Sequence, residues 1–363
     1  MSRLKEPARS VCALFERLVS VPTAPFFERS ALQRALSWAR SSLPRSVAVH
    51  VHRGGAVLRY QGSGTRPALC LAGHIDHPTF HLKGNRARMM GGLPAHLLPG
   101  SAIQAFPARP SSNEPLGIGR LGRGRDGTFQ VHWTRPPSRR AAFAVLDLPP
   151  FVLDGRWVLS RSIDDLMGSA ISLEVLRRAA SAGLKTNLTV LLHRAEEVGF
   201  VGALDLIARK HVSLLDSVLS IETSRELPGA RPGKGPVIRL GDKASAFDPN
   251  LTALLDLAAS KLKPRKIRVQ RLRLTGGTCE ATAYLAFGYE ASGVAIPLVN
   301  YHNGWGAKSI APEKVRVEDI AGAVELLLEA AKLFPFENLR GRLRARLAAR
   351  QREHSRHLAF ELA

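Results

Sequence analysis

The second half of the chain alternates short apolar runs with longer amphipathic stretches. LTVLLHR, which begins at residue 188, and DSVLSIE, which begins at residue 216, have the length and composition of buried strands. SAISLEVLRRAASAG, which begins at residue 169, carries its apolar residues at helical spacing. Strands that alternate with helices of this length form a sheet with right-handed crossovers. The pattern therefore predicts an α/β fold.

A different kind of sequence interrupts this pattern. Residues 84–155 are rich in glycine, proline and arginine, and they contain short alternating segments such as FQVHW but no helical stretch. This composition predicts a small β-barrel-like insert. We therefore expect a main α/β domain in two parts, residues 1–83 and 156–338, with the insert at 84–155 and a basic C-terminal tail at 339–363.

Length and composition exclude several classes of protein. With 363 residues, 45% of them hydrophobic, the chain can form a large buried core. No apolar run approaches the roughly 18 residues of a membrane-spanning helix, and charges interrupt the N-terminal segment where a signal peptide would be apolar. The 3 cysteines are too few for a disulfide framework. We expect a cytoplasmic protein that does not bind membranes.

The chain is strongly basic. It has 52 Lys and Arg residues against 30 Asp and Glu residues, which gives a net charge of +22. Such a charge attracts nucleic acids, acidic surfaces or acidic substrates. Aromatic residues, which would supply stacking platforms for bases, make up only 6% of the chain and are almost absent from the basic tail. We therefore interpret the charge as a general surface property and expect no specific nucleic-acid partner.

Acidic and imidazole side chains follow five of the predicted strands, at the point where each strand ends. In open α/β sheets, ligands bind at the carboxyl ends of the strands. Each residue alone has an ordinary explanation: two adjacent glutamates are usually part of a solvated loop, and an aspartate before a helix can cap it. Five such endings at one edge of a sheet are harder to explain as coincidence. The residues are His74 and Asp76, Asp164 and Asp165, Glu196 and Glu197, Glu222, and His302.

Two histidines and three carboxylates form a suitable ligand set for a pair of zinc-like ions. Residues i and i+2 of a strand point to the same side, so Asp76 can accept the second ring N–H of His74 and orient the imidazole. If Glu197 binds metal, Glu196 remains as a free carboxylate beside the activated water. A general base must lie at that position.

Taken together, these motifs resemble a known family. GHIDHP, SIDDLMGSA, RAEEVGFVGA, SIET, GKGPVIRLGDK, LTGGT and NYHN appear in the order and approximate spacing of the co-catalytic zinc aminopeptidases. That family includes the glutamyl, deblocking and tetrahedral-shell (TET) aminopeptidases. The resemblance covers most of residues 8–335. It implies a zinc-exopeptidase-like α/β/α sandwich as the catalytic domain, with the β-barrel-like domain inserted between the HxD and DD motifs.

The resemblance also implies roles for the site residues. Asp164 matches the carboxylate that bridges two metal ions. His74 and Glu222 match the remaining ligands of one ion, and Glu197 and His302 those of the other. Zinc is the expected metal, with cobalt and manganese as alternatives.

The same likeness assigns Glu196 as the catalytic base and Asp76 as the residue that supports His74. It implies a cis peptide bond between Asp164 and Asp165 as well. The chain departs from the family pattern at Leu166, where the family usually has Arg, and at Cys279, where it usually has Asp. Substrate specificity therefore cannot be transferred from the family.

These patterns lead to one principal functional hypothesis and two alternatives. We expect an aminopeptidase that hydrolyses N-terminal residues of short peptides by means of a water activated by two divalent metal ions. A deacylase or amidase could use the same site, because fold does not determine function. A catalytically inactive binding protein is the third reading, although the retention of Glu196 and of all five ligands argues against it. We expect the protein to form a homo-oligomer.

Overall fold

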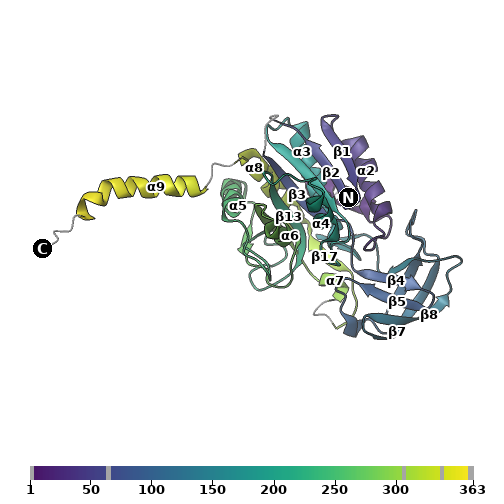
Figure 1. Cartoon of the computed structure of the whole chain (residues 1–363). Helices are drawn as coiled ribbons and strands as arrows, with labels where there is room; N and C mark the ends of the chain where they lie inside the picture. The colour runs from purple at the N-terminus through teal and green to yellow at the C-terminus, as the bar shows by residue number, and fades with distance from the viewer. Residues whose placement is uncertain (1–3, 63–66, 305–307, 336–338, 359–363) are drawn as a thin grey trace.

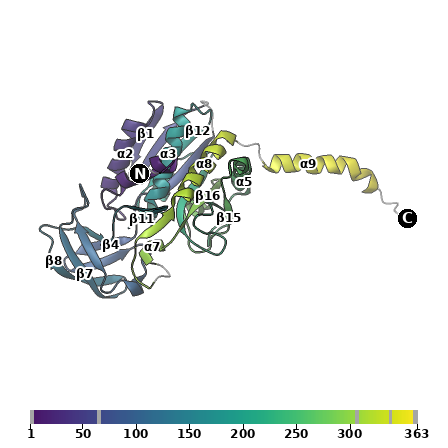
Figure 2. The same ribbon diagram turned by 180° about the vertical axis from the view of Figure 1, so that it is seen from behind.

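The structure is a computed structural model that describes residues 4–62, 67–304, 308–335 and 339–358. Its centre is an eight-stranded sheet, covered by helices on both faces, and a separate barrel lies beside it (Figures 1 and 2). In spatial order the sheet strands are β1 (Val47–His52), β2 (Gly55–Tyr60), β12 (Asn187–His193), β3 (Ala68–His74), β13 (Ser217–Arg225), β16 (Ala291–Leu298), β14 (Val237–Arg239) and β15 (Gln270–Leu272).

The predicted α/β fold is confirmed. The four central strands, β12, β3, β13 and β16, run parallel to one another. Strand β2 pairs antiparallel with both β1 and β12, whereas β14 pairs antiparallel with β16 and parallel with β15. The helices are α1 (Ala8–Leu18), α2 (Arg29–Ser42), α3 (Leu166–Ser181), α4 (Val201–Ala208), α5 (Pro249–Leu262), α6 (Glu280–Ala286), α7 (Tyr301–Gly304), α8 (Val317–Leu333) and α9 (Leu339–His354).

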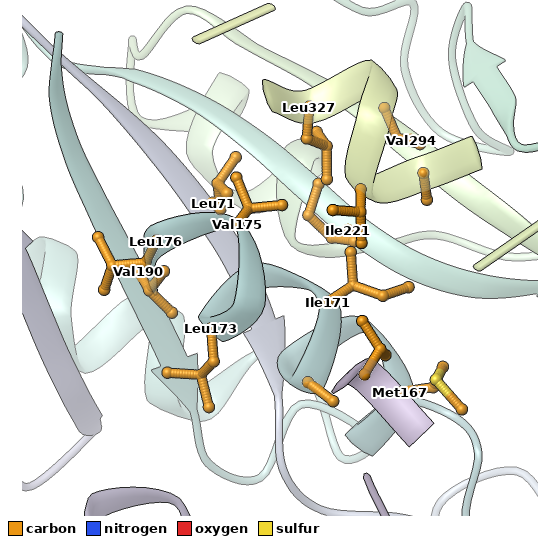
Figure 3. Packing of buried hydrophobic residues seen from close by; sticks show 14 of the residues in the cluster. Leu71, Met167, Ile171, Leu173, Val175, Leu176, Val190, Ile221, Val294 and Leu327 are labelled. Carbon is orange, nitrogen blue, oxygen red and sulfur yellow. The ribbon is translucent and has the colours of Figure 1, made fainter. Parts of the chain in front are cut away.

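Two hydrophobic cores form the faces of the sandwich. Leu69 and Leu71 of β3 pack in the larger core, together with side chains of α1, α2, α3, α5 and α8. The alternating residues Cys70 and Ala72 belong to the opposite core, with α4 and α6. Figure 3 shows side chains of α3 directed toward Leu71 and neighbouring sheet residues. Because both faces are covered, the central strands are continuously apolar, as the sequence pattern requires.

The inserted barrel is closed. Its strands, in order around the barrel, are β4 (Thr79–Lys83), β5 (Arg86–Met90), β8 (Thr128–Arg135), β7 (Gly117–Arg125), β6 (Ala102–Phe106) and β9 (Phe143–Leu146). Its interior holds a separate apolar cluster that includes Phe80, Leu121 and Phe129. A short 3₁₀ helix, Ala95–Leu97, lies in this segment, where no helical stretch is predicted. The barrel thus builds its own core.

A three-stranded sheet lies where the chain passes from the barrel back to the α/β domain. It consists of β10 (Val152–Asp154), β11 (Trp157–Ser160) and β17 (Glu313–Arg316). At the other end of the molecule, helix α9 extends away from the sandwich (Figures 1 and 2). It forms within the predicted basic tail, whose residues 359–363 lie outside the described part of the chain. In the described residues, none of the helices is both long and apolar enough to cross a membrane.

One buried carboxylate holds the loop before β14 onto helix α8. Asp319 is fully buried, and its two oxygens accept hydrogen bonds from the N–H groups of Gly233 (2.6 Å) and Gly235 (2.7 Å). Gly235 has a φ of +95°, and a Cβ atom there would lie 1.9 Å from the carbonyl oxygen of Arg268. Only glycine can therefore bring this N–H group to the carboxylate.

We predict that Asp319→Asn lowers the free energy of unfolding by about 1–3 kcal/mol, because the amide nitrogen cannot accept a hydrogen bond and one buried N–H loses its partner. Urea denaturation measures the change. Asp256→Asn is the matched control, since this aspartate forms an ion pair with Arg271 at the surface, with side-chain exposures of 41% and 55%. Equal effects of the two substitutions would contradict the prediction.

Candidate active site

The parallel register of the central strands brings His74, Glu197 and Glu222 to one edge of the sheet. Asp164 reaches this edge differently from the prediction, because it follows β11 of the separate three-stranded sheet. His74 ends β3 opposite His193, which ends β12. The turn after β12 carries Glu196, whose N–H donates to Asp76 Oδ1 (3.0 Å), and Glu197, whose N–H donates to Asp76 Oδ2 (3.2 Å). Asp76 also lies beside the imidazole, with 3.5 Å between its Oδ1 and His74 Nδ1. It therefore links the ends of two neighbouring strands.

Five predicted ligands form two groups that share one carboxylate. In the first group, His74 Nε2 lies 3.8 Å from Asp164 Oδ1 and 3.9 Å from Glu222 Oε2. In the second, His302 Nε2 lies 3.4 Å from both Asp164 Oδ2 and Glu197 Oε1. The ligand atoms of each group lie within 4.8 Å of one another. Asp164 directs one oxygen toward each histidine, which is the arrangement that a bridging ligand needs.

The two adjacent aspartates have separate surroundings. The peptide bond between Asp164 and Asp165 is cis, as the resemblance implies. Asp165, rather than Asp164, caps helix α3, because its Oδ1 accepts the N–H of Gly168 (3.2 Å) and also that of Thr223 (3.0 Å). Asp164 is left to face His74 and His302.

The geometry fits divalent cations. His302 Nδ1 donates to the carbonyl oxygen of Gly92 (2.6 Å), so its Nε2 is left as an acceptor. This Nε2 and Glu197 Oε1 are both buried and have no hydrogen-bond partner among the described residues. Unpaired lone pairs that converge in a buried site are costly unless a cation binds them. Imidazole nitrogen and carboxylate oxygen are ligands that zinc prefers.

Burial also perturbs the acidity of the site. Burial raises the pKa of Glu196 well above its usual value, and the neighbouring charge of Glu197 adds to the shift, against the opposing effect of His74. The pKa of Glu222 is likewise raised well above its usual value, first by burial and then by the charge of Glu280. So many carboxylates cannot remain ionised together in a dry site unless positive charge is bound with them.

Sequence reasoning missed four residues that support the site. Glu313 Oε2 accepts the N–H groups of Ile163 (2.7 Å) and Asp164 (3.1 Å), while its Oε1 accepts that of His302 (2.9 Å). Nothing in the sequence around Glu313 indicates this role, because strand β17 reaches the site only through the tertiary fold. The other three are His77, His193 and Glu280. His77 directly follows the HxD motif and could have been suspected.

The two departures from the family pattern are both buried. Leu166 begins helix α3 and packs in the main core. Cys279 precedes helix α6, and its N–H donates to Asp242 (3.2 Å). Burial raises the pKa of the Cys279 thiol to about 11, so the thiol is neutral at ordinary pH. Neither side chain contributes a charge to the site.

A cavity of about 330 Å³ opens beside the ligand groups. Phe200, Leu227 and Leu274 contribute to an apolar part of its wall, and Arg225 and Arg239 also line it. The Nε atom of Arg239 is buried and has no hydrogen-bond partner in the described part of the chain. The cavity therefore offers a buried positive group near the paired ligand groups.

The fold is similar to that of solved aminopeptidase structures, including TET aminopeptidases. A TET aminopeptidase from Thaumarchaeota archaeon SCGC AB-539-E09 has a similar structure, with a TM-score of 0.75 and 18% identity over 91% of this chain and 99% of the other. An aminopeptidase from Desulfurococcus kamchatkensis gives a TM-score of 0.73 and 19% identity over 90% of this chain and 96% of the other. The TET1 peptidase of Pyrococcus horikoshii gives a TM-score of 0.69 and 18% identity over 89% of this chain and 99% of the other.

The M42 glutamyl aminopeptidase family matches residues 139–314, a segment that contains four of the five predicted ligands and Glu196. This match and the aminopeptidases of similar fold indicate that the protein is a hydrolase of peptide bonds. The family resemblance inferred from the sequence motifs is thereby confirmed. A comparison with curated protein sequences finds no match.

We predict that zinc ions raise the melting temperature of the protein after treatment with a chelator. A ligand that binds only the folded state stabilises it by about 2.7 kcal/mol when its concentration is 100 times Kd. Scanning calorimetry with and without zinc measures the shift. Asp164→Asn should abolish most of it, because Asp164 faces both histidines. A shift of the same size in Asp164→Asn would place the zinc elsewhere.

Proposed function

We propose that the protein is a metal-dependent aminopeptidase that removes N-terminal residues from short peptides. The observation that carries this proposal is the shared position of Asp164 between two ligand groups, with the free carboxylate of Glu196 close by. Glu196 Oε2 lies 3.8 Å from His74 Nε2. The match to the M42 peptidase family supports the same reaction class.

The two ligand groups would hold the metal ions. His74, Asp164 and Glu222 would bind one ion, and Asp164, Glu197 and His302 would bind the other. Divalent metal ions at such a site supply Lewis acidity, which polarises the scissile carbonyl group and makes a water acidic enough to lose a proton near neutral pH. Zinc suits the ligand set best, with cobalt and manganese as alternatives.

Glu196 would act as the general base. Its side chain is almost completely buried and lines the cavity, and its backbone N–H donates to Asp76, which fixes the turn from which the carboxylate projects. It would accept the proton of the attacking water and return that proton to the leaving amine. Asp76 would act indirectly, because it orients both His74 and the turn that carries Glu196.

The cavity suits the side chain of one N-terminal residue. Its volume of about 330 Å³ lies at the small end of ligand pockets. Arg239 is almost fully buried in its wall, where a carboxylate of the substrate would compensate the cost of burying a guanidinium group.

We also propose that the protein assembles into a homo-oligomer. The structure of the Pyrococcus horikoshii TET1 peptidase is described as assembling into a tetrahedron or a large octahedral shell. Leu214 and Leu215 of this chain are 63% and 69% exposed, and Phe287 is 55% exposed. Large apolar side chains that gather on a surface are typical of protein contacts.

The proposed reaction is tested with free and N-acetylated versions of one set of peptides, each beginning with Glu or Leu. We predict cleavage of the peptides with free amino termini only, with higher kcat/KM for those that begin with Glu. Chromatography of the products measures both. Equal cleavage of the blocked peptides would favour the amidase alternative, and cleavage of neither would favour the inactive binding protein.

The adjacent glutamates should respond differently to the same substitution. We predict that Glu196→Gln retains the metal content but lowers kcat by at least about 100-fold, because it removes the proton acceptor and preserves the shape. Glu197→Gln should instead lose one metal ion per chain. Elemental analysis of both variants, alongside peptide assays, measures the two effects. The reverse pattern of metal loss would exchange the two roles.

A further inference from the structure

Glu280 places another carboxylate beside the proposed metal site. It is the first residue of helix α6, and its side chain is fully buried. Its Oε1 lies 3.1 Å from His193 Nδ1, and its Oε2 lies 3.2 Å from Ser220 Oγ. The charged end is thus held by two polar groups at once, which gives the carboxylate a defined orientation in the interior.

Ser220 connects Glu280 to one of the proposed ligands. Its Oγ lies 3.1 Å from Glu222 Oε1, as well as near Glu280 Oε2, so the hydroxyl stands between the two carboxylates. The other oxygen of Glu222, Oε2, faces His74 Nε2 at 3.9 Å. The two oxygens of Glu222 therefore have different partners, and only Oε2 remains free on the His74 side.

His193 ties this arrangement to the sheet. It ends strand β12, and its Nε2 lies 3.0 Å from the hydroxyl of Tyr284, which is also buried. When the ring proton is on Nδ1, His193 donates to Glu280 and accepts from Tyr284. The network joins helix α6 to strands β12 and β13, which carry or precede three of the carboxylates in the proposed site.

We propose that Glu280 is a positioning residue that tightens metal binding selectively on the His74 side of the site. It acts through the hydroxyl of Ser220, whose one proton is shared between Glu280 Oε2 and Glu222 Oε1 in a three-centre hydrogen bond. This contact holds Glu222 with Oε2 directed toward the metal position. Glu280 also adds negative charge there, since one of its oxygens lies within 4.8 Å of the ligand atoms of Glu196 and Glu222. The inference rests on the proposed assignment of the metal ligands.

The selectivity follows from the position of Glu280. The described residues that could hold a cation on the other side are Asp164, Glu197 and His302, and Glu280 belongs to no group with Glu197 or His302. Residues around metal ligands typically change metal affinity by about 10–100-fold when they are removed. A loss of this size confined to one of two neighbouring sites distinguishes positioning from a general loss of stability.

The test measures zinc affinity by competition with a chromophoric chelator in two single-site backgrounds. Glu197→Gln leaves the His74 side with its full ligand set, and adding Glu280→Gln should weaken zinc binding there by about 10–100-fold. His74→Gln leaves the His302 side, where adding Glu280→Gln should change the affinity less than about twofold. Loss of affinity in both backgrounds, or in neither, would overturn the proposal.

A matched control separates positioning from folding. Asp242 is another fully buried carboxylate near the start of helix α6, where it accepts the N–H of Cys279 (3.2 Å), but it contacts none of the proposed ligands. Asp242→Asn should leave zinc affinity unchanged in the Glu197→Gln background. An effect as large as that of Glu280→Gln would show that the local fold alone is responsible, which would also overturn the proposal.

Ser220→Ala provides a second variant, in which the buried carboxylate of Glu280 keeps its contact with His193. It should weaken zinc binding in the Glu197→Gln background, and combining it with Glu280→Gln should produce less than the product of the two separate effects. Independent, fully multiplicative effects would contradict action through Ser220. Because all these readouts are metal affinities, they remain decisive if the protein fails to cleave the peptide set, which would refute only the proposed function.

Discussion

The central constraint on this structure is the burial of many carboxylates at one edge of a sheet. Buried negative charges repel one another and lose their hydration, so each requires a compensating partner. The fold supplies two kinds of partner. Backbone N–H groups bind Asp76, Asp165 and Glu313, whereas His74 and His302 face Asp164 and its neighbours. The second group is the one that needs cations.

The carboxylates bound by backbone groups determine where the others lie. Asp76 holds the turn that carries the paired glutamates, and Asp165 holds the start of helix α3 beside Thr223. Glu313 joins the segment before Asp164 to the backbone of His302, although these residues are far apart in the chain. These contacts hold the ligand groups in position, as a preorganised site requires.

Glu28, which lies between the two N-terminal helices, is another buried carboxylate that binds a backbone N–H group, and it supports the turn that carries Glu196 and Glu197. Its Oε1 accepts the N–H of Ala195 (2.9 Å), and its Oε2 accepts Arg194 Nε (2.7 Å). Ala195 has a φ of 51°, in the left-handed region that non-glycine residues rarely adopt. The ion pair with Arg194 offsets part of the cost of burying the carboxylate, and the turn presents Glu196 and Glu197 toward the cavity. Glu28, which directly precedes helix α2, thus supports the site without lining the cavity.

The sequence by itself determined the order of strands and helices, the inserted barrel and the residues at the strand ends, because periodicity and local composition are properties of short segments. It also placed His74, Glu197 and Glu222 at one sheet edge, since parallel strands end together. Only the tertiary structure decided that Asp165 caps the helix while Asp164 faces both histidines, and that Glu280 and Glu313 join the site. These contacts link residues that no local pattern connects, and their geometry depends on how whole elements pack.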